Sequence, residues 1–416
     1  MVRVRPHNPT QAHAHSKPTL HTNSRQLTAL ALAIALGAAI SLGITRFAYG
    51  LLLPSMRADM DWSYALAGAM NTANAMGYFL GALACPWLMR RFGPSLLLVI
   101  GSLLAGVFML GSGFVTQTEG LLVQRLLAGA ASALVFVAGG LLAARLGARE
   151  PRRSGLLLGI YYGGTGVGIV LSSLLVPLAL DAAQSVLLGW RWAWWVLGAL
   201  CLLFSLVLVW PARVMAAWAE PVTPVGVVPA TFRWRPFGFG LSAYALFGVG
   251  YIGYMTFVIA LLRSQGRSDT EITVFYALLG FAVMASSRIW ARLLDRFQDG
   301  RPLALLNALL GLATLLPALT HAWGCVMLSG MLFGGVFLSV VASTTALVRH
   351  NLPRSAWGHG ISAFTTVFAA GQIVGPTVVG WIADGAGGLE RGLVFSACAL
   401  WVGAALALRQ RSLGLT

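Results

Sequence analysis

Long apolar stretches, separated by short polar loops, run through almost the whole sequence. A helix rises about 1.5 Å per residue, so about 20 apolar residues cross the roughly 30 Å hydrocarbon core of a bilayer. Twelve runs are of about that length: 28–53, 64–88, 95–114, 119–144, 154–180, 189–210, 237–262, 271–293, 302–320, 322–348, 357–383 and 391–408. The pattern predicts an all-α polytopic membrane protein with twelve transmembrane helices.

Three segments lack this apolar pattern and suggest the domain organisation. Residues 1–26 carry prolines and histidines without an apolar period, which predicts a disordered tail. Residues 211–236 are polar and rich in proline, which is typical of a linker, and 410–416 form a short second tail. The linker would divide the spans into two six-helix bundles, at 27–210 and 237–409.

Two short motifs recur at a spacing of 205 to 207 residues, which supports this division. The first is an Arg-Phe pair at the end of the second and eighth spans, and the second is a pair of glycines four residues apart in the fifth and eleventh spans. The matching pairs are Arg91-Phe92 with Arg296-Phe297, and Gly164-x3-Gly168 with Gly371-x3-Gly375. The sequence therefore predicts a duplicated six-helix unit with parallel repeats.

Composition and charge agree with a membrane protein and give its orientation. Hydrophobic residues make up 58% of the 416 residues and charged residues 10%, against about 25% charged in soluble proteins. The net charge of +16 is scattered between spans, so we expect no nucleic-acid partner. Twenty basic residues fall on the side of the termini and five on the opposite side. The positive-inside rule predicts that both termini are cytoplasmic, in a plasma (bacterial inner) membrane.

Two arginines lie deep within predicted spans, and an intramembrane charge is a functional hypothesis by default. Arg46 lies in the segment GITRFAYGLLLP, about 12 Å along the helix from Pro54. Arg125 lies about 9 Å along its helix from Glu119, which is near the same face of the membrane, so the two arginines are at similar depth. All twelve acids fall in loops or near helix ends. The two guanidinium groups can therefore bind an anion such as a carboxylate or phosphate. The alternative is that backbone carbonyls and hydroxyls satisfy them structurally.

Tyrosines near these arginines suit an organic ligand, because each combines an apolar ring with a polar tip. The candidate substrate-binding residues are Arg46, Tyr49, Arg125, Tyr162, Tyr251 and Tyr254. Many tyrosines in such a protein only pack. The glycine pairs, together with Pro376, are expected to allow close helix approach and bending. No metal or other cofactor is expected, because the four cysteines lie in or beside spans and form no ligand pattern.

Several motifs resemble the major facilitator superfamily (MFS) of transporters. The loop signature of that family appears in altered form as Pro86-x3-Arg90-Arg91-Phe92-Gly93 and as Ala291-x3-Asp295-Arg296, and helix 4 carries Arg125-x3-Gly129. GITRFAYGLLLP, GVGYIGY and GQIVGP are similar to the YbfB/YjiJ-type branch. The resemblance implies a 6+6 pseudo-symmetric fold whose helices 1, 4, 7 and 10 line a central cavity. It also implies gating roles for Arg91, Asp295, Arg296, Gly164, Gly168, Gly371, Gly375 and Pro376.

The favoured function is that of a secondary active or facilitative transporter, which moves a small anionic or amphipathic organic solute by alternating access. We expect a monomer in the lipid bilayer, and protons are a candidate co-substrate. The alternatives are a non-transporting membrane sensor and, least favoured, a membrane-embedded enzyme. An enzyme needs a nucleophile and base or a metal cluster, whereas His350 and His359 have no acid beside them. We therefore expect no enzymatic activity.

The altered loop signatures predict a one-sided cytoplasmic latch. Asp295 can bind the positive start of helix 5 near Arg152 and Ser154, whereas Arg90 would repel a helix start. Asp295→Asn is therefore expected to shift the population toward the state that is open to the cytoplasm, and Arg90→Gln to change little. Cysteine accessibility on the two faces measures this shift. Equal opening by the two variants would refute the asymmetry.

Overall fold

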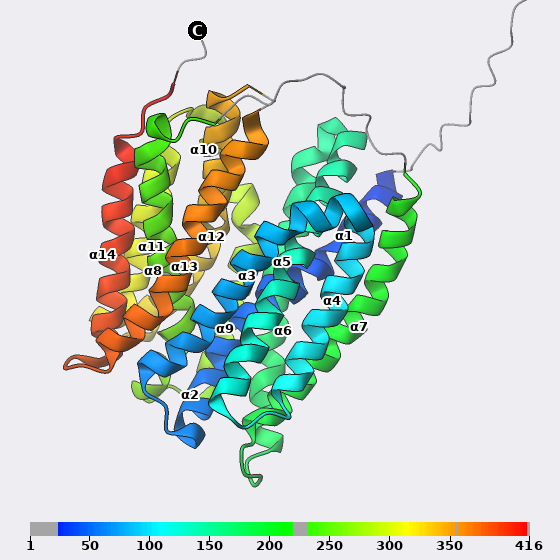
Figure 1. The fold of residues 1–416 in the computed structure, drawn as a ribbon. Coiled ribbons are helices and arrows are strands. Elements are labelled where there is room, and N and C mark those ends of the chain that lie inside the picture. Colours follow the sequence, from blue (N-terminus) through cyan, green and yellow to red (C-terminus); the bar gives the residue numbers. More distant parts are fainter. Residues whose placement is uncertain (1–23, 219–231, 354–355, 414–416) are drawn as a thin grey trace, which may run out of the picture.

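Helices form all the regular structure in the part of the chain that the computed structural model describes (Figure 1). That part is residues 24–218, 232–353 and 356–413, and of Ser287 only the backbone is described. The elements are α1 (Ser24–Ala38), the π-helix η1 (Ala39–Phe47), α2 (Tyr49–Met60), α3 (Tyr64–Phe92), α4 (Pro94–Ser112), α5 (Thr118–Arg149), the 3-10 turn η2 (Pro151–Arg153), α6 (Ser154–Ala182), α7 (Trp190–Ala216), the 3-10 turn η3 (Arg235–Phe237), α8 (Gly238–Ser264), α9 (Asp269–Ile289), α10 (Ala291–Arg296), α11 (Arg301–Leu319), α12 (Trp323–Asn351), α13 (Trp357–Ala383) and α14 (Gly388–Leu408).

These elements make twelve spans, as the sequence predicts. Eleven helical segments of the described chain are long and apolar enough to cross a membrane, and the first of them joins α1, η1 and α2 into one span of 37 residues. The twelfth span is α3, whose 29 residues include Asn71, Thr72 and Asn74, and these polar side chains lower its mean hydropathy. The predicted class, an all-α polytopic membrane protein, is confirmed.

Helix packing follows the same plan in the two halves of the chain. Helix α3 packs on α5 and α4 on α7 in the first half, as α9 packs on α12 and α11 on α14 in the second. The domain boundaries stay a prediction, because 219–231 of the expected linker and most of the expected first tail lie outside the described residues. Helix α7 continues to Ala216, past the predicted end at residue 210, and includes Pro211 as a buried residue.

The predicted glycine pairs bring helix backbones together at equivalent places in the two halves. A Cβ atom on Gly164 would lie 1.9 Å from Ala35 O of α1, and one on Gly371 would lie 2.2 Å from Ala245 O of α8. Gly168 and Gly375 make similar approaches one turn further along their helices. Only glycine leaves room for such backbone contact. These positions therefore hold each half together.

The two halves meet through α3 with α13 and through α6 with α9. We call the side where α1 begins and α14 ends the terminal face, and the opposite side the distal face (Figure 1). Helix α3 begins at the distal face, and among the described residues its hydrogen bonds to α13 stop at Thr72, although α3 continues to Phe92. The halves are thus hydrogen-bonded at their distal ends, and they spread apart toward the terminal face (Figure 1).

Gly164→Leu is expected to lower the free energy of unfolding by about 1–3 kcal/mol or more, because the new side chain would force α6 away from α1. Gly155→Leu is the matched control on the same helix, since nothing lies within 4 Å of a Cβ atom there. Thermal unfolding of the detergent-purified protein measures the difference. Equal melting temperatures for the two variants would contradict the packing role.

Candidate functional site

A π-helix places Arg46 in the membrane. The segment Ala39–Phe47 is fully buried and carries Arg46 in its last turn, after which Ala48 connects it to α2. π-helical turns are rare and occur often at functional sites, because the extra residue per turn redirects side chains. The sequence analysis predicts an ordinary helix here, so this feature was missed. Hydrophobic periodicity carries no signal for it.

Arg125 is held by protein groups on three sides. Its Nη1 donates to Thr45 O at 2.7 Å and its Nη2 to Asn71 Oδ1 at 2.8 Å. The guanidinium also lies over the rings of Tyr49, at 5.0 Å, and Trp194, at 5.6 Å. The side chain is only 2% exposed. The structural alternative therefore describes Arg125 well: it ties α5 to η1 and α3.

Asn71 extends this network to the other half of the protein. Its Nδ2 donates to Thr256 Oγ1 of α8 at 2.8 Å. Asn71 was not among the predicted site residues. An amide within an otherwise apolar span predicts hydrogen bonding between helices, which Asn71 makes to α5 and α8, but it does not by itself predict a site.

Arg46 differs from Arg125 in its partners. It is also 2% exposed, but its Nε and Nη2 are buried and form no hydrogen bond with the described residues. Its contact is with the ring of Tyr78, whose centroid lies 5.2 Å from the guanidinium carbon. No Asp or Glu is buried anywhere in the described ranges. The structure thus brings the two arginines side by side. Arg125 makes two hydrogen bonds and leaves only its Nε buried and unpaired, whereas both Nε and Nη2 of Arg46 are buried and unpaired.

The second half presents an amide and aromatic rings near this point. The ring of Phe47, the residue after Arg46, contacts that of Phe337 at 5.8 Å, and Phe337 lies parallel to Tyr251 at 6.1 Å. Tyr251 donates through its hydroxyl to Gln372 Oε1 at 2.9 Å. The Nε2 of Gln372 is buried and forms no hydrogen bond within the described chain. Gln372 was missed, although it is the only amide residue in α13.

The other predicted tyrosines are not gathered into one site. Tyr49 donates to Ala67 O at 2.7 Å, and the hydroxyl of Tyr254 is 2.7 Å from Ser329 Oγ. Both hydroxyls thus have protein partners. Tyr162 is half-buried and packs against Phe136 at 5.6 Å. Tyr251 contacts Phe337, the ring beside Phe47, directly, whereas Tyr254 is connected to that ring only through Phe333.

The predicted gating residues with charged side chains lie exposed near the terminal face. Asp295 forms no hydrogen bond or ion pair with the described residues. Arg296 lies over the ring of Phe297, at 5.7 Å, and Arg91 over that of Trp87, at 6.0 Å. The latch between Asp295 and the start of α6 is therefore not formed in this conformation, and it stays a prediction.

A cavity of about 380 Å³ opens near the terminal face within the second half. Arg235, Leu241 and Val367 are among its lining residues, and it does not include Arg46. It is lined almost entirely by apolar atoms and backbone, so we do not assign the site to it.

Twelve spans in two similar halves are the architecture of a membrane transporter that works by alternating access. The chain belongs to the MFS: residues 38–408 match the family model described as "Uncharacterised MFS-type transporter YbfB". The predicted family and branch are confirmed. The protein is an integral membrane transporter of a small molecule and not an enzyme.

Curated relatives of this chain are also transport or resistance proteins. The chloramphenicol resistance protein of Streptomyces lividans is 26% identical over 88% of this chain and 93% of its own. The 4-hydroxybenzoate transporter PcaK of Pseudomonas aeruginosa is 25% identical over 81% of this chain and 83% of its own. The multidrug resistance protein MdtG of Dickeya zeae is 29% identical, but the match spans only 32% of either chain.

Solved structures share the fold at low sequence identity. A bacterial homologue of the human lysosomal transporter Spinster superposes with a TM-score of 0.66, at 17% identity, over 94% of this chain and 99% of its own. The nucleoside transporter NupG gives a TM-score of 0.68, at 14% identity, over 92% of this chain and 99% of its own. The 6+6 fold is thereby confirmed.

Replacing the two arginines is expected to affect stability in different ways. Arg125→Met breaks two charge-assisted hydrogen bonds and leaves Asn71 Oδ1 buried and unpaired, so the free energy of unfolding should fall by about 1.5–3 kcal/mol or more. Arg46→Met removes a buried charge that has no hydrogen bond at Nε or Nη2, so stability should stay the same or rise. Thermal unfolding in detergent compares the two. A larger loss for Arg46→Met would contradict these assignments.

Proposed function

We propose that the protein carries small organic anions across the bacterial inner membrane and that Arg46 receives the anionic group. One observation supports this above all: Nε and Nη2 of Arg46 are buried without a hydrogen bond. A buried guanidinium is costly unless it is paired. A carboxylate or phosphate that accepts from these two nitrogens would form the bidentate geometry that arginine favours.

The surroundings favour an anion with an apolar or aromatic body. Tyr78 lies beside Arg46, and the rings of Phe337 and Tyr251 continue from Phe47 toward Gln372. Gln372 Nε2 offers a second unpaired donor from the other half of the protein. The relative PcaK, named for 4-hydroxybenzoate, supports this class of solute, because that compound is an aromatic carboxylate.

Arg125 is given a positioning role in this proposal. It fixes Thr45, the residue before Arg46, through its carbonyl, and it lies over the ring of Tyr49. Tyr162 packs against Phe136 and Tyr254 against Phe333, and neither is given a substrate contact. Substrate contact is assigned to Arg46 and Tyr251 among the predicted residues.

The terminal face is assigned to the cytoplasm, because the basic residues gather on that side. The conformation described, with its halves bonded at the distal ends, is then the one that faces the cytoplasm. With no buried acid in the described chain to relay protons, we propose that any coupled proton moves with the substrate's own carboxyl group. The protein acts as a monomer in this proposal.

A second candidate function is the export of amphipathic neutral compounds. The chloramphenicol resistance relative, which aligns along most of this chain, favours it. In that case Arg46 would stabilise the fold or orient a neutral solute, and a variant without the charge of Arg46 would still transport.

Arg46→Gln is expected to reduce the transport of organic anions at least about tenfold, because the amide lacks the charge and the bidentate fork. Arg46→Lys should retain part of the activity through its charge. Uptake and efflux of aromatic and aliphatic carboxylates, sugars and neutral aromatic compounds are measured in proteoliposomes, with and without a pH gradient. Arg288→Gln is the control, since Arg288 is exposed near the terminal end of α9.

Normal anion transport by Arg46→Gln, or transport of neutral and cationic compounds alone, would overturn the proposal. The second outcome would support the export of neutral compounds. Failure to move any compound, with folded protein, would favour a non-transporting sensor.

A further inference from the structure

The start of α3 is capped by a carboxylate from the opposite half of the protein. Asp384, which directly follows α13, accepts from Tyr64 N through Oδ1 at 2.6 Å and from Ala65 N through Oδ2 at 2.9 Å. These nitrogens belong to the first two residues of a 29-residue helix. They are donors that a helix cannot satisfy by itself.

The capping of α3 is shared between a local and a distant residue. Ser63 Oγ accepts from Leu66 N at 3.1 Å, and Ser63 O accepts from Ala67 N at 3.0 Å. The bond from Ala67 N is the first of the helix itself. With the two bonds to Asp384, the N–H groups of Tyr64, Ala65 and Leu66, which carbonyls of the helix cannot reach, all have partners. The carboxylate charge also lies at the positive end of the helix dipole. Asp384 therefore adds both hydrogen bonds and a favourable charge interaction.

This cap sits where the backbones of the two halves touch. A Cβ atom on Gly380 would lie 2.3 Å from Tyr64 O, and one on Gly68 would lie 2.3 Å from Pro376 O. One turn further along α3, Thr72 Oγ1 donates to Ile373 O at 2.8 Å. Opening the distal face requires α3 and α13 to separate here, and the two bonds to Asp384 would then break.

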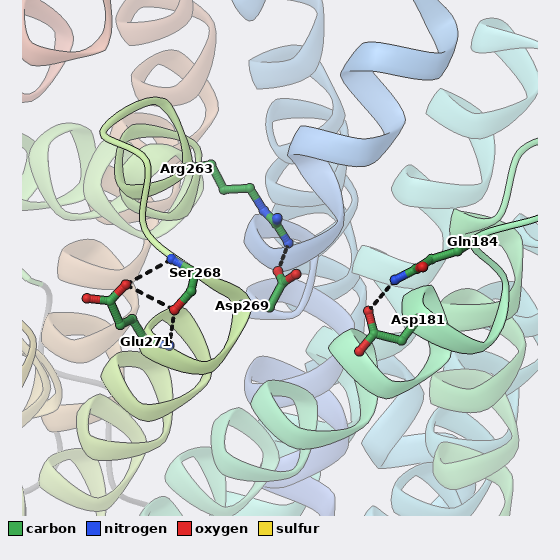
Figure 2. Close-up of polar contacts among 6 residues, drawn as sticks. All are labelled: Asp181, Gln184, Arg263, Ser268, Asp269 and Glu271. Atoms are coloured by element: carbon green, nitrogen blue, oxygen red, sulfur yellow. Dashed lines mark hydrogen bonds and ion pairs between the residues drawn. The ribbon is translucent and has the colours of Figure 1, made fainter.

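The other place where the halves meet has no such cap from the opposite half. At the distal start of α9, Ser268 and Glu271 of α9 itself form a capping box. Asp181, near the end of α6, accepts instead from Gln184 of its own loop at 3.0 Å (Figure 2). Asp269 pairs with Arg263 of the same half (Figure 2). Of these two helix starts in the described chain, only that of α3 is capped by a carboxylate from the opposite half.

We propose that Asp384 is a latch that keeps the distal face closed and that its release accompanies opening of that face. The helix pair α3 and α13 then has its latch at the distal face, whereas Arg90 replaces the acid at the other end of α3. The latch predicted for Asp295 would belong to the other pair, α6 and α9, at the terminal face. Each pair of helices would thus hold one side of the transporter closed.

The test measures the distance between spin labels on the two halves at the distal face. Ala58 on α2 and Ala386 after α13 are both exposed, and they are changed to cysteine in a chain whose four native cysteines are replaced by alanine. Pulsed electron spin resonance in nanodiscs then gives the ratio of long to short distances. No substrate is needed, so the test is independent of the proposed function.

Asp384→Asn is expected to raise that ratio about threefold to tenfold, because the amide loses the charge and keeps only one of the two acceptor oxygens. Asp384→Ala, which removes both acceptors, is expected to raise it at least as much. Asp181→Asn is the matched control at the same face and should leave the ratio unchanged. If Asp384→Ala does not give folded protein, the distance ratio of the milder variant Asp384→Asn tests the proposal. An unchanged ratio for Asp384→Asn, or an equal rise for Asp181→Asn, would overturn the proposal.

Discussion

The accommodation of two arginines in an apolar bundle is the constraint on which the rest of this structure depends. Arg46 and Arg125 are each only 2% exposed, and no acid is buried in the described chain. Arg125 takes the carbonyl of Thr45 and the amide oxygen of Asn71, which are the acceptors beside the π-helix. With these acceptors engaged, Arg46 has the face of Tyr78 and no hydrogen bond at Nε or Nη2. A buried guanidinium without these hydrogen bonds favours binding of an anion, because ion pairing offsets a large part of the free-energy cost of burying the charge.

Helix α3 connects this site with the contact between the halves. Asn71 bonds to Arg125 on one side and to Thr256 of α8 on the other, and the next residue, Thr72, bonds to α13. The start of the same helix, about 12 Å away along its axis, is capped by Asp384. An anion that pairs with Arg46 would act beside a helix whose distal end is fastened to the opposite half. This arrangement gives the site and the distal contact a shared rigid element, which is the physical requirement for coupling them.

The fold alone does not identify the solute. Proteins of this fold carry chemically different compounds, and function depends on the side chains placed at the centre. In the proposed site those side chains are the guanidinium of Arg46 from the first half and Gln372, whose Nε2 has no partner, from the second, with aromatic rings between them. A solute that contacts both halves can favour one arrangement of the halves over another, as alternating access requires.

The membrane class, the twelve spans, the duplication and the family could all be predicted from the sequence, because the length of an apolar run and the spacing of motifs do not depend on how the helices pack. The sequence also located Arg46 and the glycines at 164, 168, 371 and 375, since a charge in an apolar run and a repeated small-residue pair are visible in one dimension. Which arginine is hydrogen-bonded could not be read from the sequence, because Thr45 and Asn71 come to Arg125 from different helices. In the same way, the bond from Asp384 to the start of α3 joins residues about 320 positions apart. A carboxylate at one helix end and a free N–H at another are each common, and their pairing depends on how the two halves pack.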